Sequence, residues 1–156
     1  MIEASVQEFV RSGIERVYPG KCEEIFPFAS KIESDGIGIL AIHDHEEEHL
    51  AFAAGTLSGV TFSSDLVRDL GMLNSNVVVG AYVLSEGQPG HWSITYAVKL
   101  RYTWVAEATA SAQMIVDALS AVPVFVQRGI EILSPKYGGE PWGIPGGWWL
   151  ALMDRF

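Results

Sequence analysis

Residues 91–105, HWSITYAVKLRYTWV, constrain the fold of this chain more than any other stretch. Large apolar side chains alternate there with small or polar ones over the whole length, as in a β-strand that buries only one face. The apolar positions are Trp92, Ile94, Tyr96, Val98, Leu100 and Tyr102. The stretch therefore predicts a long strand with one apolar face.

Three further strands are expected from shorter segments. Residues 36–43 and 49–57 are apolar and are joined by a charged tip, which favours two antiparallel strands in a hairpin. Residues 76–86 are rich in valine and lead through a glycine-containing turn into the long strand. Periodicity alone leaves residues 55–60 open between strand and loop.

Three helices are predicted by apolar side chains that recur every three or four residues. The first ends at Pro19-Gly20, and the second is short, running from a Ser63 or Ser64 N-cap to Gly71. The third is long and Ala-rich from Ala106, and Pro123 is expected to kink it. The apolar positions of the first helix are Ile2, Val6, Phe9, Val10, Ile14 and Val17.

The order of these elements defines a fold class. Helices that flank antiparallel strands argue for an α+β fold, a two-layer antiparallel sheet flanked by an N-terminal and a long C-terminal helix. Between the first helix and the Ser34-Asp35-Gly36 turn we expect a connector that carries a short apolar patch of Ile25, Phe26 and Phe28. We expect residues 1–139 to form a single domain and residues 140–156 a Trp-rich extension.

Charge and composition restrict the partners. The net charge is -9 and the ten Lys and Arg are scattered, so a nucleic-acid partner is not expected. The first 17 residues lack the uninterrupted apolar core of a signal peptide, and no apolar run approaches the ~20 residues of a spanning helix. The only cysteine, Cys22, cannot form an internal disulfide. These features favour a cytoplasmic protein.

Residues 43–49, HDHEEEH, are the one segment with metal-binding side chains close together. His43, His45 and His49 could converge on zinc across a hairpin, but their spacing matches no specific zinc motif, and a charged hairpin tip is the preferred interpretation. Other catalytic signatures, such as a P-loop, a GxSxG or a CxxC, are missing as well. We therefore expect no cofactor and no enzymatic activity.

The C-terminal extension contains the strongest functional hint. It has too many large apolar side chains to remain in water, because burying each is worth roughly 1.5–3 kcal/mol. The extension either folds back over the sheet of its own chain or docks into a partner or a second copy, and Asp154 and the net acidity disfavour a membrane surface. The candidate partner-binding residues are Trp142, Ile144, Trp148, Trp149, Leu152 and Phe156.

A family resemblance supports this interpretation. Leu73-Asn74 before a strand, a hairpin around Gly87, a long helix from Ala106 and the ending Tyr137-Gly138-Gly139 together resemble the type III secretion chaperone-like superfamily, in particular the actinobacterial branch related to YbjN. The resemblance covers residues 70–139 well and the first half only by element order. Pro123 and the Trp-rich extension depart from the pattern.

The resemblance implies a helix-sheet-helix domain that often pairs as a dimer and binds extended segments of other proteins. The sequence therefore predicts a non-enzymatic protein-binding domain, chaperone-like or adaptor. Two alternatives stay open: an accessory subunit anchored in a larger complex by its C-terminal tail, and a small metal-binding protein that uses His43, His45 and His49.

Overall fold

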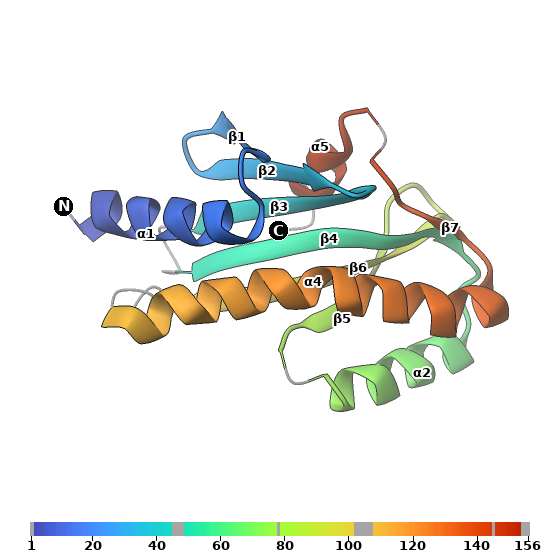
Figure 1. Ribbon diagram of the computed structural model, residues 1–156. Coiled ribbons are helices and arrows are strands. Elements are labelled where there is room, and N and C mark those ends of the chain that lie inside the picture. Colours follow the sequence, from blue (N-terminus) through green and yellow to red (C-terminus); the bar gives the residue numbers. More distant parts are fainter. Residues whose placement is uncertain (1, 45–48, 78, 102–107, 145, 154–156) are drawn as a thin grey trace.

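The computed structural model describes residues 2–44, 49–77, 79–101, 108–144 and 146–153. These residues form helices and strands in an order that the first figure shows from blue to red (Figure 1). The elements are α1 (Ile2–Val17), β1 (Cys22–Phe26), β2 (Ala29–Ser34), β3 (Ile37–Asp44), β4 (His49–Val60), α2 (Ser64–Ser75), β5 (Ala81–Glu86), β6 (Trp92–Arg101), α4 (Ala108–Tyr137), β7 (Glu140–Pro141) and α5 (Trp148–Met153).

The strands form one antiparallel sheet in the order β1-β2-β3-β4-β6-β5, with the short β7 paired to β4. Helices α1 and α4 lie on one face, which we call the inner face, and α5 lies on the opposite, outer face (Figure 1). The predicted α+β class, with its N-terminal and long C-terminal helices flanking an antiparallel sheet, is confirmed.

The core lies between the inner face and the two long helices. In the central strands, Phe52 is paired with Val98 and Ala54 with Tyr96, and all four side chains are buried on the inner face. The alternation seen in the sequence of β6 thus corresponds to burial against α4. The same face of the sheet receives Ile14 from α1.

Residues 21–34 are not the connector that the sequence predicted. They form the β1–β2 hairpin at the edge of the sheet, and Phe26 and Phe28 stack at its turn with ring centroids 5.7 Å apart. The prediction was wrong because β1 is largely exposed and carries two glutamates, so it lacks the apolar alternation that marks a half-buried strand.

The segment before β5 also differs from its prediction. Helix α2 continues past Gly71 to Ser75, and β5 begins only at Ala81. Next to this start, the side-chain amide of Asn74 donates to the carbonyl of Tyr82 (3.0 Å), and its side-chain oxygen accepts from the backbone amide of Tyr82 (2.7 Å). The amide thus takes the place of a neighbouring strand at the edge of β5.

Two further expectations concern regular structure. The segment that periodicity left open, residues 55–60, belongs to β4, whose pairing with β6 has register shifts between Gly55 and Leu57 and between Ser58 and Val60. Helix α4 runs on through Pro123 without interruption (Figure 1). No helix among the described residues is long and apolar enough to cross a membrane.

The end of α4 is tied to α2 through Asp69. The hydroxyl of Tyr137 donates to its carboxylate, and the Lys136 ammonium lies 3.3 Å from it. The hydrogen bond from Tyr137 lowers the pKa of Asp69 below its usual 3.8. The same hydrogen bond raises the pKa of Tyr137 from 10.0 to about 12.

These shifts predict how stability depends on pH. The lowered pKa of Asp69 stabilises the fold at a pH above the usual carboxyl pKa, and this contribution is lost as the pH falls through the lowered pKa. The raised pKa of Tyr137 stabilises the fold below pH 10, and this contribution is lost as the pH rises towards 12. The difference in melting temperature between wild type and Tyr137→Phe should therefore be constant from about pH 5 to about pH 9 and shrink on both sides. Tyr18→Phe is the control on the acid side, because the Tyr18 hydroxyl donates to the backbone carbonyl of Leu119 and not to a carboxylate. A Tyr137→Phe difference that is flat down to acid pH would contradict the prediction.

Candidate protein-binding site

The outer face of the sheet is lined mainly by small side chains. The pairing register places Leu40 of β3 beside Ala53 of β4, and Ala53 beside Ala97 of β6, all three buried. Since neighbours along a strand point to opposite faces, Gly38 and Gly55 belong to this same face. The outer face is therefore a shallow surface on which another segment can approach the backbone closely.

The chain itself supplies such a segment. Gly138 and Gly139 follow α4 with positive φ values of 71° and 82°, a conformation that glycine adopts without strain and that ends many helices. The chain then pairs as β7 with Leu57 and Ser58 of β4, beyond the last residue that β3 pairs with. It crosses to the outer face and ends in α5 (Figure 1). We call residues 138–153 the C-terminal segment.

Two tryptophans of the C-terminal segment lie directly on two glycines of the sheet. A Cβ atom at Gly38 would lie 2.7 Å from Cε2 of Trp148, and one at Gly55 would lie 1.5 Å from Cε3 of Trp142. No real side chain approaches another that closely. Any residue other than glycine at these two positions would force the indole ring above it to move.

Polar groups from β2 surround the aromatic rings. The indole N–H of Trp148 donates to Oε1 of Glu33 at 2.9 Å. The ammonium of Lys31 lies 4.3 Å from the ring centroid of Trp149, a cation–π contact. Lys31 also lies 3.4 Å from Glu23 and 3.6 Å from Glu33, and its side chain is only 16% exposed. At the edge of the outer face, β2 thus provides a hydrogen-bond acceptor, Glu33, and a cation, Lys31, that contact the indole rings.

The structure brings most of the candidate partner-binding residues onto the sheet of their own chain. Trp148 and Leu152 are buried there and form a second hydrophobic cluster with Ala29 and Leu40. Trp142 and Trp149 are half-buried against this cluster, whereas Ile144 is exposed. Phe156 lies outside the described residues.

The important residues that sequence reasoning missed are Gly38, Gly55, Lys31 and Glu33. The two glycines stand inside strands, where glycine weakens the strand and often marks the close approach of another group. That signal was available for Gly38, which was predicted only as part of the strand expected over residues 36–43. Lys31 and Glu33 carry no local signal, because Glu33 and its partner Trp148 are 115 residues apart.

His43 and His49 do not converge. His43 pairs with Leu50 and Asp44 with His49, so the side chains of His43 and His49 lie on opposite faces of the hairpin. His45 lies outside the described residues. Within the described ranges, no group of three or more His, Cys, Asp or Glu side chains is arranged to hold a metal ion.

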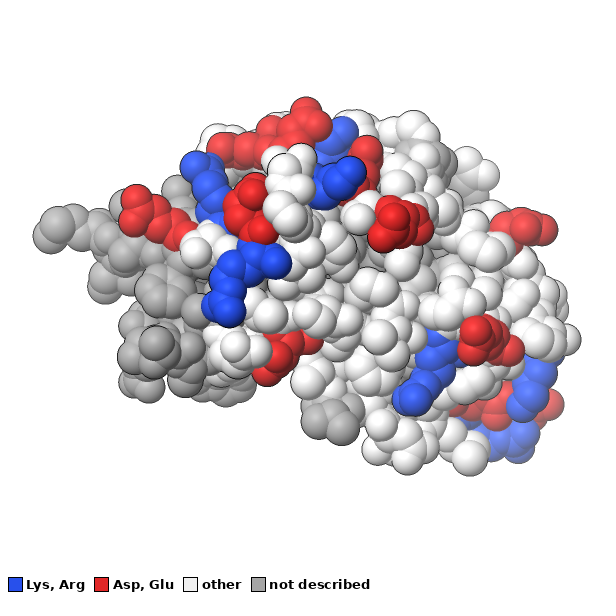
Figure 2. All heavy atoms as spheres, in the orientation of Figure 1, with Lys and Arg blue, Asp and Glu red and all other residues white. Residues whose placement is uncertain are grey.

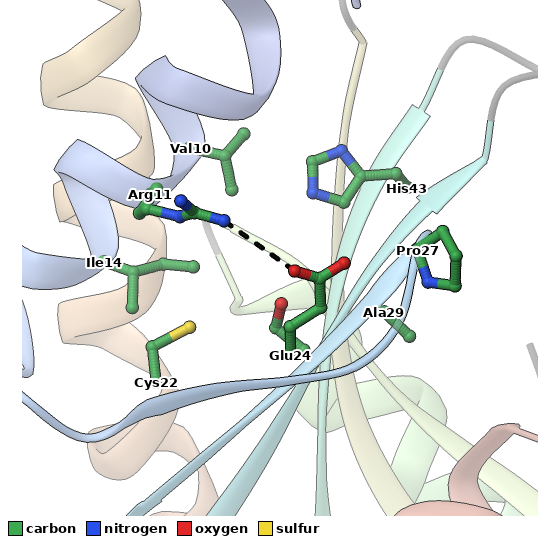
Figure 3. Close-up of a pocket in the computed structure, with 9 residues that line it drawn as sticks. Val10, Arg11, Ile14, Cys22, Glu24, Pro27, Ala29 and His43 are labelled. Carbon is green, nitrogen blue, oxygen red and sulfur yellow. Dashed lines mark ion pairs between the residues drawn. The ribbon is translucent and has the colours of Figure 1, made fainter. Parts of the chain in front are cut away.

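His43 instead lines a small cavity under α1, with Cys22 and the ion pair between Arg11 and Glu24 (Figure 3). The cavity has a volume of about 40 Å³, and a second cavity of about 130 Å³ shares Arg11, Cys22 and Glu24 with it. Burial raises the pKa of the Cys22 thiol, which disfavours the thiolate that a nucleophile or metal ligand needs. The cavity is therefore a poor candidate for chemistry.

Replacing Gly55 by alanine is expected to displace Trp142 from the sheet. The new methyl group would overlap the ring, which must move by about 2 Å to reach an ordinary contact distance. We expect the free energy of unfolding in urea to fall by roughly 1–2 kcal/mol, because Trp142 is only half-buried and full burial of a large side chain is worth about 1.5–3 kcal/mol. Chymotrypsin should also cleave faster within residues 142–149.

Gly71→Ala is the matched control for this substitution. A Cβ atom at Gly71 meets nothing within 4 Å, and the position lies inside α2, so this substitution should stabilise by about 0.4–1 kcal/mol. If both variants are equally stable and equally resistant to chymotrypsin, Trp142 does not depend on the glycine beneath it.

Comparison with known proteins identifies the fold. The sequence matches no protein-family model and no curated protein. Among solved structures, it is similar to YbjN from E. coli, with a TM-score of 0.58 and 11% identity over 80% of this chain and 91% of that one. It is also similar to the ExsC-ExsE complex, with a TM-score of 0.60 and 11% identity over 83% and 94% of the two chains.

A third similar structure is the Yersinia pestis type III secretion chaperone SycH, solved in complex with a stable fragment of YscM2. Its TM-score is 0.54, with 12% identity over 79% of this chain and 98% of that one. The chain therefore has the YbjN-like, type III secretion chaperone-like fold that the sequence predicted. At this identity the likeness concerns the fold.

Proposed function

We propose that this protein is a non-enzymatic protein-binding domain, chaperone-like or adaptor, that holds an extended segment of a partner protein on the outer face of its sheet. The observation that carries the proposal is the C-terminal segment itself. The sheet already binds one piece of polypeptide, through β-pairing at the edge of β4 and, on the outer face, through two tryptophans on glycines and a hydrogen bond to Glu33. A partner segment with similar features would use the same contacts.

The comparisons add support for protein binding. SycH and the ExsC-ExsE pair were each solved as a complex with a protein partner, and this chain shares their fold. The surface in Figure 2 carries acidic and basic side chains next to one another over α1 and the β1–β2 hairpin and again around α2. That mixture, with the net charge of -9, suits a polypeptide better than a phosphate backbone.

The proposal assigns different tasks to the two parts of the chain. Residues 1–139 would be the binding domain, and residues 140–156 an extension that occupies the binding face when no partner is present. In the absence of a partner, the positions where its side chains would bind are occupied by side chains of the extension: Trp142, Trp148, Trp149 and Leu152. We also propose that the protein is cytoplasmic. The family resemblance implies that it can pair as a homodimer.

Site-specific crosslinking in cells of the source organism tests the proposal on the full chain. A photo-reactive amino acid is placed at Lys99, which is exposed on the outer face of β6, or at Val124, which is 58% exposed on α4. The proposal expects one defined protein to be crosslinked from Lys99 and not from Val124. Crosslinks from neither position, or from Val124 alone, would refute binding on the outer face.

An accessory subunit anchored by its C-terminal tail is the second candidate. Exposed Ile144 and Leu150 favour it, because both are apolar side chains that the C-terminal segment leaves uncovered. An anchored subunit should co-purify with its complex at a fixed stoichiometry, whereas a chaperone-like protein should release its partner. Size-exclusion chromatography of the crosslinked and uncrosslinked partner at rising dilution separates the two.

A further inference from the structure

We infer that the outer face recognises tryptophan: the partner segment is a peptide that turns between two tryptophans about six residues apart, for which Trp142 and Trp148 of this chain stand in. The inference rests on the proposed function and names the chemistry of its ligand. Three independent features of the sheet support it: the two glycines, the polar groups around the rings and the glycine-rich attachment of the C-terminal segment.

The glycines are the first feature. Gly38 and Gly55 are inside strands and are not among the residues with positive φ, so the backbone does not require glycine at either position. Glycine inside a strand costs stability, because it adds chain entropy and buries no side chain. What the positions do have in common is an indole ring closer than a Cβ atom would allow. Both glycines therefore act as recesses for flat aromatic rings.

The polar groups are the second feature, and they separate tryptophan from other apolar residues. Glu33 accepts from the indole N–H of Trp148, which neither leucine nor phenylalanine can replace. Leaving that acceptor without its donor also removes a charge-assisted hydrogen bond. Lys31 over the ring of Trp149 favours an electron-rich aromatic face, and tryptophan is the best of these. An aliphatic segment would satisfy none of these groups.

The attachment of the C-terminal segment is the third feature. Its path from α4 to α5 has positive φ at Gly138, Gly139, Gly143 and Gly147. These residues let the segment reach the two recesses, and they impose few restraints on its leaving. A tethered segment acts at an effective concentration of roughly millimolar, so a partner must bind more tightly than the segment does or meet a chain in which the segment is displaced.

Rescue by indole tests the recess at Gly38 on the full chain. In Trp148→Gly the ring is removed and its place is left open. We expect saturating free indole to raise the melting temperature of this variant by roughly 5 °C and to leave wild type unchanged. Trp92→Gly is the control, because it removes a different indole, a half-buried one that stacks on Phe62 at 4.5 Å, away from Glu33. Indole should not rescue it.

Peptide binding to the same Trp148→Gly chain separates the inference from the function on which it rests. The first probe is a fluorescent peptide with the sequence of residues 140–156, EPWGIPGGWWLALMDRF. In the second probe, leucine replaces the tryptophans that correspond to Trp142 and Trp148. We expect the tryptophan peptide to bind at least tenfold more tightly, by fluorescence anisotropy.

Each other outcome has a definite meaning. Equal binding of the two peptides, or no rescue by indole, overturns recognition of tryptophan and leaves segment binding intact. Binding of neither peptide overturns both. If Trp148→Gly does not fold, as judged by far-ultraviolet circular dichroism, Trp142→Gly opens the recess at Gly55 and receives the same two peptides, with the same outcomes deciding.

Discussion

Replacing Phe52 by alanine is expected to lower the free energy of unfolding of the whole domain by about 3–5 kcal/mol. Phe52 is fully buried in the middle of β4, paired with Ala41 on one side and Val98 on the other. Small or β-branched neighbours cannot extend into the space that the ring leaves, so a cavity remains and adds to the lost transfer free energy. Urea unfolding followed by far-ultraviolet circular dichroism measures the change.

The control for Phe52→Ala is a truncation that opens no cavity. Val124 is 58% exposed on α4, and Val124→Ala should change the free energy of unfolding by no more than about 0.5 kcal/mol. A loss below about 1 kcal/mol for Phe52→Ala would mean that the inner face of the sheet is packed far more loosely than its burial indicates.

Replacing Trp148 by alanine should have an equally large but local effect. Trp148 is 3% exposed and belongs to the smaller cluster with Ala29, Leu40 and Leu152, which lies on the other face of the sheet from the main core. Losing its ring and its hydrogen bond to Glu33 should weaken docking of the C-terminal segment by about 3–5 kcal/mol. At 1.4 kcal/mol per factor of ten, amide exchange in residues 148–153 should become at least about a hundredfold faster.

The strands report whether that effect is local. Amides of β4 and β6 should keep their exchange rates in Trp148→Ala, because their side chains on the inner face are not touched. Leu150→Ala, on the exposed side of α5, should leave all rates unchanged. Acceleration throughout the sheet would show that the C-terminal segment and residues 1–139 unfold as one cooperative unit.

The parts of the fold that could be predicted from the sequence are those with a strong local pattern. The alternation in β6 and the helical periods of α1 and α4 report burial directly, because each element packs one face against the core. The β1–β2 hairpin gave no such signal, since its outer strand is polar and exposed. The end of α2 was placed too early because a glycine was taken for its stop, whereas the helix continues to Ser75 and is capped at Asn76.

The candidate site was only half predictable for a related reason. Counting tryptophans and leucines shows that the C-terminal segment must be buried, but no local pattern says on which surface. The answer depends on glycines and a glutamate about a hundred residues earlier in the chain. Such pairs become visible only when the sheet register is known, because the register decides which residues share the outer face.

Strands β3 and β7 pair with different parts of the same edge of β4, and this arrangement affects how the protein behaves in a concentrated solution. Up to Ala54 the backbone groups of that edge are paired with β3, and at Leu57 and Ser58 they are paired with β7. Backbone groups left unpaired at a sheet edge are templates for another chain, and apolar surface beside them adds to the risk. A protease that removed the C-terminal segment would therefore expose a sticky edge and the apolar outer face together, and the shortened protein would be prone to aggregate.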